Sequence, residues 1–248
     1  MVGTAAGLIL ALIGFSLLQG GRKTTPGVQS NSNAPAIAAA IPQAPATPGW
    51  RERIKALPEE KQSEAFSNEG DELLARGRYD EAAEAYRLSL QREPEAESVH
   101  YNLGIALVRA GKVEEGIAAY REALRIAPDY AEAHNNLGNI LLKQGKNREA
   151  AEHFRAAIEI NPDVANGHNN LGIALAKEGE NAEAHFQRAV ELDPNYRDAH
   201  FNLAQSFLAR SAYAEAERHL QEALRIDPAF RPARQALEEL SKMREGQE

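Results

Sequence analysis

Three stretches of the sequence nearly repeat one another: HYNLGIALVRAGKVEEGIAAYREALRIAP from His100, HNNLGNILLKQGKNREAAEHFRAAIEINP from His134, and HNNLGIALAKEGENAEAHFQRAVELDP from His168. The prolines that punctuate the copies are 32 or 34 residues apart: Pro94, Pro128, Pro162, Pro194 and Pro228. Units of this size are too small to bury an apolar face alone, so they must stack on their neighbours. The sequence therefore predicts an array of stacked units.

The copy over residues 131–164 shows the pattern inside one unit. Leu137 and Leu141 are four residues apart, so they share one face of a first helix. Ala150 and Phe154 have the same spacing and line one face of a second helix. A glycine separates the two helices, and a proline ends the copy because it cannot continue a helix. Each copy is predicted to be a helix–turn–helix unit.

From about Ser63 to Glu245, this pattern resembles the tetratricopeptide repeat (TPR) family. The resemblance implies an all-α fold: a right-handed α-solenoid of five helix–turn–helix units with a concave inner face and a C-terminal capping helix. The units are expected at residues 63–96, 97–130, 131–164, 165–196 and 197–230. A lead-in segment is expected at 50–62, and the capping helix and tail at 231–248.

Two departures from the repeat pattern make specific predictions. Glu69 and Arg92 replace apolar residues in the first unit, which fits a terminal repeat with one side facing water. The fourth unit lacks two residues, but Ala182 and Phe186 keep the four-residue spacing of the second helix. We therefore place the deletion in the turn, and expect Phe186 to be buried on a helix that begins near Asn181.

The N-terminal part of the chain is of another kind. Residues 1–21 are a hydrophobic segment, and its uncharged run Val2–Leu18 would span about 26 Å as a helix, near the lower limit for a bilayer core. We predict an uncleaved, single-pass membrane anchor. A cleaved signal peptide is the main alternative, although a positively charged start and a good cleavage site are missing. An artefact of start-site choice is the third interpretation.

Residues 22–49 are rich in proline and alanine and are predicted to be a disordered linker. Arg22 and Lys23 follow the apolar run, and basic flanks tend to stay cytoplasmic, which slightly favours a cytoplasmic repeat domain. The uncharged linker favours the opposite side, because such linkers commonly accompany domains held off the outer face of a membrane. The side of the membrane therefore stays open.

Charge and composition exclude several classes of function. The part of the chain after the linker contains 26 basic and 36 acidic residues. Its net charge of −10 disfavours nucleic-acid binding. The histidines at 100, 134, 168 and 200 occur once per unit, too far apart to share a zinc ion, and are predicted to pack between helices. The chain has no cysteine, phosphate loop or nucleophile elbow. We expect no enzyme, cofactor or metal.

One polar position recurs in all five units, directly before the Leu-Gly pair or its equivalent: Asn68, Asn102, Asn136, Asn170 and Asn202. In similar arrays, notably the TPR region of O-linked N-acetylglucosamine transferases, asparagines at this place form a ladder along the concave face. A carboxamide both donates and accepts, so it can bind a peptide backbone whatever the side chains. The alternative interpretation is that these asparagines only brace the helices.

Neighbouring positions on the same face are predicted to supply specificity: Tyr101, Asn135, Asn139, Asn169, Phe201 and the basic row Arg109, Lys143 and Lys177. The family's Lys-containing clamp for C-terminal carboxylates is not expected, because the matching positions carry tyrosine, asparagine and phenylalanine. The sequence thus predicts a membrane-tethered scaffold that binds an extended segment of a protein partner. The alternative is a non-catalytic TPR subunit that works beside a glycosyltransferase-type enzyme.

Overall fold

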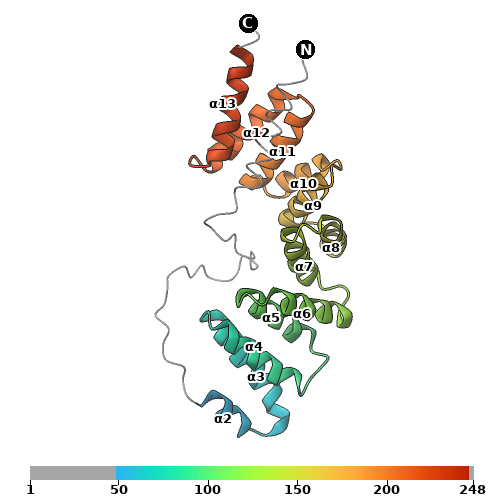
Figure 1. Cartoon of the computed structure of the whole chain (residues 1–248), viewed down its shortest axis with the longest axis vertical. Helices are drawn as coiled ribbons and strands as arrows, with labels where there is room; N and C mark the ends of the chain where they lie inside the picture. The colour runs from blue at the N-terminus through green and yellow to red at the C-terminus, as the bar shows by residue number, and fades with distance from the viewer. Residues whose placement is uncertain (1–48, 246–248) are drawn as a thin grey trace. The chain divides into compact units, whose positions relative to one another are not determined.

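The computed structural model describes residues 49–245, and this part of the chain is all helical (Figure 1). The helices of the first half are α2 (Trp50–Lys55), α3 (Glu59–Ala75), α4 (Tyr79–Leu90), α5 (Glu97–Arg109), α6 (Val113–Ile126) and α7 (Ala131–Lys143). Those of the second half are α8 (Asn147–Ile160), α9 (Ala165–Lys177), α10 (Glu183–Leu192), α11 (Arg197–Ala209), α12 (Tyr213–Ile226) and α13 (Arg231–Glu245).

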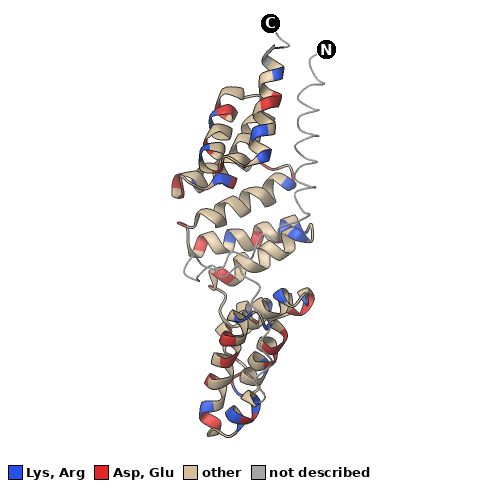
Figure 2. Ribbon diagram, turned by 90° about the vertical axis from the view of Figure 1, so that its left-hand side faces the viewer, with Lys and Arg blue, Asp and Glu red and all other residues tan. Residues whose placement is uncertain are grey.

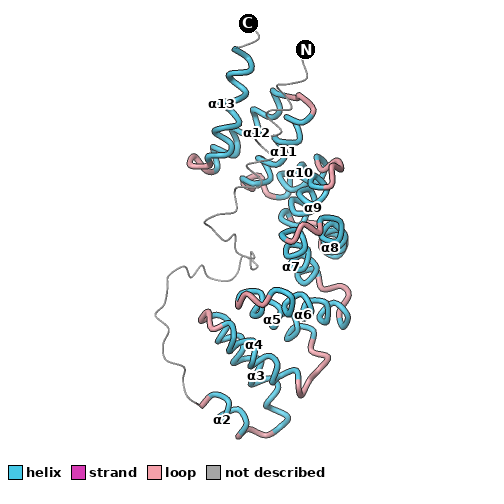
Figure 3. The backbone as a smooth tube through the Cα atoms, in the orientation of Figure 1, coloured by secondary structure: helices cyan, strands magenta, loops and turns pink. Residues whose placement is uncertain are grey.

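The described residues fall into two compact units, 49–140 and 141–245, which divide within α7. In the first unit α3 packs on α4 and α5 on α6, and in the second α9 packs on α10 and α11 on α12. Short loops connect the helices (Figure 3). We refer to the pairs α3–α4, α5–α6, α7–α8, α9–α10 and α11–α12 as repeats 1 to 5.

The turns inside the repeats share one backbone conformation. Gly111 ends α5 with a φ of 82° and its counterparts in repeats 1, 3 and 4 are also left-handed glycines. The N–H of Lys112 returns to the carbonyl of Leu107, which satisfies a carbonyl that the helix end leaves unpaired. In repeat 5 the same place is taken by Ser211, which keeps the left-handed conformation with a φ of 62°.

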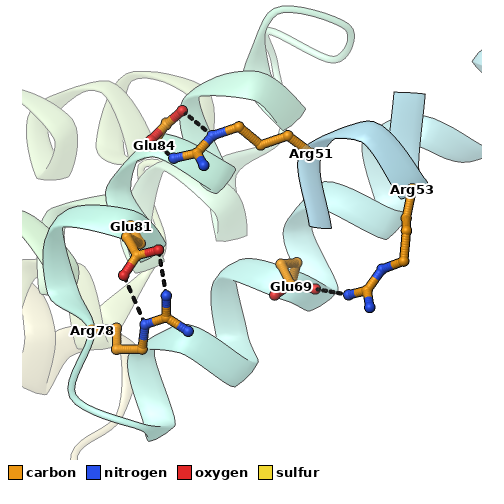
Figure 4. Close-up of polar contacts among 6 residues, drawn as sticks. All are labelled: Arg51, Arg53, Glu69, Arg78, Glu81 and Glu84. Atoms are coloured by element: carbon orange, nitrogen blue, oxygen red, sulfur yellow. Dashed lines mark hydrogen bonds and ion pairs between the residues drawn. The ribbon is translucent and has the colours of Figure 1, made fainter. Parts of the chain in front are cut away.

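The N-terminal face of repeat 1 is covered by α2, which corrects the expectation that it faces water. The Trp50 and Phe66 rings meet edge to face at 6.2 Å, and Arg51 pairs with Glu84 (Figure 4). Glu69, predicted to face water, has a side chain only 15% exposed and lies 4.0 Å from Arg53 of α2 (Figure 4).

Arg92 and Leu57 also lie near this end of the array. Arg92 is exposed, but its guanidinium lies 4.9 Å from the centre of the Phe66 ring and donates to Gln62 at 3.0 Å. Leu57 lies two residues beyond the end of α2 at Lys55 and is 39% exposed.

The deletion in repeat 4 lies in the turn, as predicted. Phe186 is 2% exposed, and α10 begins at Glu183, two residues after the expected Asn181. The Asn181 side chain instead accepts a hydrogen bond from the Glu183 N–H at 3.0 Å, within the turn that precedes the shortened helix. At the other end α13 packs on α12, with Ala233 and Leu240 buried, as expected for a cap.

In repeats 1, 2 and 4 a glycine of the first helix faces an aromatic ring of the second helix. A Cβ atom at Gly104 would lie 2.8 Å from Tyr120, and one at Gly172 would lie 2.5 Å from Phe186. Glycine is unfavourable inside a helix, by about 1 kcal/mol relative to alanine, so close packing against the ring must offset that cost. Repeat 5 uses another solution, with Ala204 and Leu220 at the two positions.

We expect the substitution Gly172→Ala to lower the free energy of unfolding by about 1–3 kcal/mol, because the methyl group would overlap the Phe186 ring. The double variant Gly172→Ala/Phe186→Leu reproduces the Ala204–Leu220 pair of repeat 5. Its loss should be smaller than the sum of the two single losses. Urea unfolding of the four proteins measures this, and strictly additive losses would contradict the proposed contact.

Candidate peptide-binding surface

The predicted site residues all lie on first helices of the repeats. Asn68 is exposed on α3, whereas Asn102, Asn170 and Asn202 are half-buried on α5, α9 and α11. Asn136 on α7 is only 6% exposed. The half-buried neighbours are Tyr101, Asn135, Asn139 and Phe201, and Asn169 is buried at 3% exposure. The basic residues Arg109, Lys143 and Lys177 are exposed in the last turns of α5, α7 and α9.

In the first unit the asparagines reach back to the preceding repeat. The amide nitrogen of Asn102 donates to Asp71 at 3.1 Å, and the amide nitrogen of Asn136 donates to the Tyr101 hydroxyl at 3.1 Å. Asp71 also accepts a hydrogen bond from the Tyr86 hydroxyl at 2.7 Å. These bonds join repeat 1 to repeat 2 and repeat 2 to α7, so they brace the stack.

In the second unit an asparagine again donates to the preceding repeat, but its acceptor is another asparagine. Asn202 donates to the side-chain oxygen of Asn169 at 2.9 Å, and Asn169 donates to the Tyr196 hydroxyl at 3.3 Å. Asn202 therefore reaches Asn169, one position before the predicted ladder residue Asn170. Asn102, Asn136 and Asn202 therefore each donate a hydrogen bond to a neighbouring repeat, whichever of the two predicted roles they serve.

Bracing leaves part of each amide available. An asparagine side chain has two N–H donors and an oxygen with two lone pairs, and each brace uses one N–H. Asn102 and Asn202 are half-buried and retain one N–H and the oxygen, as far as the described contacts show. That remainder is the donor and acceptor pair that a peptide group needs.

Aromatic residues two positions after a repeat-ending proline join this face. Tyr130 follows Pro128 and packs on Tyr101 with ring centres 4.8 Å apart, and Phe230 follows Pro228 and meets Phe201 at 5.2 Å. Burial, followed by the charge of neighbouring groups, raises the pKa of Tyr130 to about 12. Neither loop residue was predicted from the sequence as part of the site. Their common position, two residues after a repeat-ending proline, could have indicated them.

The histidines of the first helices hold the loops between repeats. His100, His134, His168 and His200 each place Nε2 2.8 to 3.1 Å from the carbonyl oxygen of the proline six residues earlier. A carbonyl only accepts, so Nε2 carries the proton and donates. Among residues 49–245 no group of three or more His, Cys, Asp or Glu side chains is placed to hold a metal ion.

Two of these histidines also pair with a histidine of the second helix. The Nδ1 atoms of His200 and His219 are 3.0 Å apart, and those of His168 and His185 are 3.4 Å apart. Because Nε2 of His200 is protonated, its Nδ1 accepts in the neutral pair and His219 donates. Burial, with the nearby His200 and Arg218, lowers the pKa of His219 to about 4.

Charged side chains of both signs are interspersed along the described helices (Figure 2). Several ion pairs connect successive repeats, such as Arg87 with Glu115 at 2.6 Å and Arg188 with Asp163 at 2.9 Å. Exposed pairs of this kind contribute little to stability individually.

No helix within residues 49–245 is long and apolar enough to cross a membrane. The predicted anchor at residues 1–21 lies outside the described residues.

Family models for the tetratricopeptide repeat match residues 67–131, 119–152 and 163–229, and a further TPR repeat model matches residues 138–179. The chain belongs to the tetratricopeptide repeat family. A search of curated proteins found no match.

Solved structures share the fold. YrrB, described as a TPR protein with an unusual peptide-binding site, is 22% identical, covers 77% of this chain and 98% of its own, and has a TM-score of 0.66. MamA from Desulfovibrio magneticus RS-1 is 22% identical, covering 68% of this chain and 97% of its own, with a TM-score of 0.63. MamA AMB-1 is 27% identical over 65% of this chain and 96% of its own, with a TM-score of 0.57.

The low pKa of His219 makes the stability of repeat 5 sensitive to acid. Between about pH 6.5 and pH 4 the unfolded chain binds a proton at this residue that the folded chain does not, so the free energy of unfolding falls as the pH falls. In His219→Ala, which matches Ala85 and Ala119 of repeats 1 and 2, this contribution is absent. Urea unfolding should show the stability difference between the two proteins shrinking towards pH 4. A difference independent of pH would contradict the assignment.

Proposed function

We propose that this chain is a membrane-tethered TPR scaffold that binds an extended segment of a partner protein along the inner face of its repeats. The observation that carries the proposal is the asparagine at one equivalent position in all five repeats. A side chain that recurs with the repeat can meet a partner whose own groups recur along an extended backbone. A peptide in an extended conformation has that property.

Hydrogen-bond capacity supports backbone recognition. The asparagines of repeats 2 and 5 use one amide N–H for bracing, and the remaining N–H and oxygen match the carbonyl and N–H of a peptide group. Half-buried Tyr101 and Phe201 lie directly before these asparagines and offer apolar contact to side chains of the partner. YrrB, which has a similar fold, is a TPR protein with a peptide-binding site.

A random peptide library displayed on phage is selected for binding to the full-length chain. The selected peptides serve as the probe, and calorimetry measures their affinities. Replacing Asn136 and Asn170 together with alanine should weaken binding at least about tenfold, because each lost amide contact is worth about 1–3 kcal/mol. Asn136 also donates to Tyr101, so unfolding must be measured on the same variant. Lower stability with unchanged affinity would show that the asparagines serve only the stack.

A second pair of variants compares the asparagine face with an exposed control position. Asn102→Asp keeps the size of the side chain but removes both N–H donors and places a carboxylate near Asp71. Glu152→Gln changes an exposed residue of α8 and serves as a control. We expect Asn102→Asp to lower both affinity and stability, and Glu152→Gln to change neither. Equal affinities of the two variants would count against the asparagine face as the binding surface.

The membrane tether is proposed from the uncharged apolar run Val2–Leu18. The basic Arg22 and Lys23 directly after it slightly favour a cytoplasmic repeat domain. Protease added to intact cells should leave such a domain intact and digest it only after lysis. Digestion before lysis would place the repeats outside, and recovery of the chain in the soluble fraction would remove the tether from the proposal.

A further inference from the structure

Repeats 2 and 5 carry an aromatic pair at the same two repeat positions, but only repeat 5 covers its pair with a cation of its own. There the guanidinium of Arg197 lies 4.4 Å from the centre of the Phe230 ring, which meets Phe201 edge to face. Asp198 and Asp227 hold the same guanidinium at 2.6 and 2.8 Å. The site in repeat 5 thus consists of an aromatic pair, a bound arginine and two carboxylates.

The corresponding place in repeat 2 has the aromatic pair without the arginine. Tyr101 and Tyr130 take the positions of Phe201 and Phe230, with ring centres 4.8 Å apart and planes at 35°. Arg197 begins α11 four residues before Phe201, and Glu97 begins α5 four residues before Tyr101. Both tyrosines are half-buried, so part of each remains open to solvent.

The charge around the tyrosine pair is negative. Glu97 shares the helix face of Tyr101, because the two are one turn apart, and Glu132 follows Tyr130 by two residues in the first turn of α7. Both carboxylates contribute to the raised pKa of Tyr130, after burial and Tyr101. In the described part of the chain neither Glu97 nor Glu132 forms an ion pair.

We propose that Tyr101, Tyr130, Glu97 and Glu132 form a receptor for the cationic side chain of an arginine or lysine in the bound peptide. The inference rests on the proposed function and names the chemistry of the partner. An aromatic face attracts a cation that lies within about 6 Å of the ring centre, and an adjacent carboxylate adds a charge-assisted hydrogen bond. Arginine is favoured over lysine because its planar guanidinium can stack on a ring while its N–H groups donate hydrogen bonds, in the plane of the group, to a carboxylate.

The internal comparison identifies the occupant. Repeat 5 places an arginine between the Phe230 ring, at the position of Tyr130, and two acidic side chains, so the scaffold accommodates a guanidinium there. The net charge of −10 on the part of the chain after the linker also favours a basic partner over an acidic one. An apolar side chain in this place would leave two carboxylates beside it without a counter-charge.

A selection experiment tests the partner chemistry. Random peptides displayed on phage are selected on the full-length chain and on the double variant Glu97→Gln/Glu132→Gln. We expect arginine and lysine to be enriched at one peptide position with the wild type, and the enrichment to disappear with the variant. Peptides bound without a basic residue, or with an acidic or apolar residue there, would overturn the inference and leave the proposed function intact.

If no peptide is selected, the proposed function is contradicted. A direct titration with a small arginine compound still tests the cation site in that case. Binding of N-acetyl-arginine amide and of its neutral analogue N-acetyl-citrulline amide is followed through the tyrosine ring signals in NMR spectra. We expect binding of the arginine compound to be at least about fivefold tighter, and to weaken between about 50 mM and 500 mM salt. Equal affinities for the two compounds would overturn the proposal.

Four variants complete the titration. Tyr130→Leu and Glu97→Gln/Glu132→Gln should each lose the preference for the arginine compound, whereas the exposed Glu152→Gln should keep it. Arg197→Gln removes the arginine of repeat 5 and leaves Phe201, Phe230 and two carboxylates, so a second cation site should appear. Retention of the preference in Tyr130→Leu, with folding confirmed by circular dichroism, would place the cation elsewhere and contradict the assignment.

Discussion

The close approach of the two helices in repeats 1, 2 and 4 is the constraint on which the other features depend. It is possible because a glycine of the first helix, such as Gly104 or Gly172, meets an aromatic ring of the second. The glycine fixes which side of the first helix is buried. Since the asparagine comes two residues before it, at about 200° around the helix, the same contact turns the amide away from the ring and towards the neighbouring repeat.

That placement explains how the asparagines can brace the stack and still keep hydrogen-bonding capacity. Asn102 and Asn202 lie where the first helices of successive repeats meet, so one N–H reaches back to the preceding repeat while the rest of the amide stays near the surface. An apolar residue there would leave the oxygen of buried Asn169 with one donor fewer, and a buried acceptor without a donor is destabilising. Stacking thus accounts for one N–H of Asn102 and of Asn202, and among the described residues it leaves the other N–H and the oxygen of each side chain unused.

The sequence predicted most of what lies within one repeat and little of what lies between repeats. The buried Phe186 and the turn deletion followed from spacing along one helix, because a two-residue deletion in the helix would have rotated the apolar face away. The contacts of Asp71 with Asn102, and of Tyr130 with Tyr101, join residues about one repeat apart or bring a loop onto a helix. Such contacts depend on side-chain direction and loop geometry, which spacing along the chain does not specify.

Repeats 2 and 5 show how one scaffold can carry opposite charge at equivalent places without altering its core. Glu97 lies in the first turn of α5, where a negative charge complements the helix dipole. Arg197 at the start of α11 has the unfavourable sign, and Asp198 and Asp227 offset this by pairing with it. Glu97 and Arg197 each lie at the start of a helix, away from the Gly–aromatic contact of repeat 2 and the Ala–Leu pair of repeat 5. Glutamate in one repeat and arginine in the other are therefore both compatible with the same helix packing. In repeat 5 one ring of the aromatic pair therefore contacts the chain's own cation, whereas in repeat 2 the half-buried pair lies near two carboxylates that form no ion pair among the described residues.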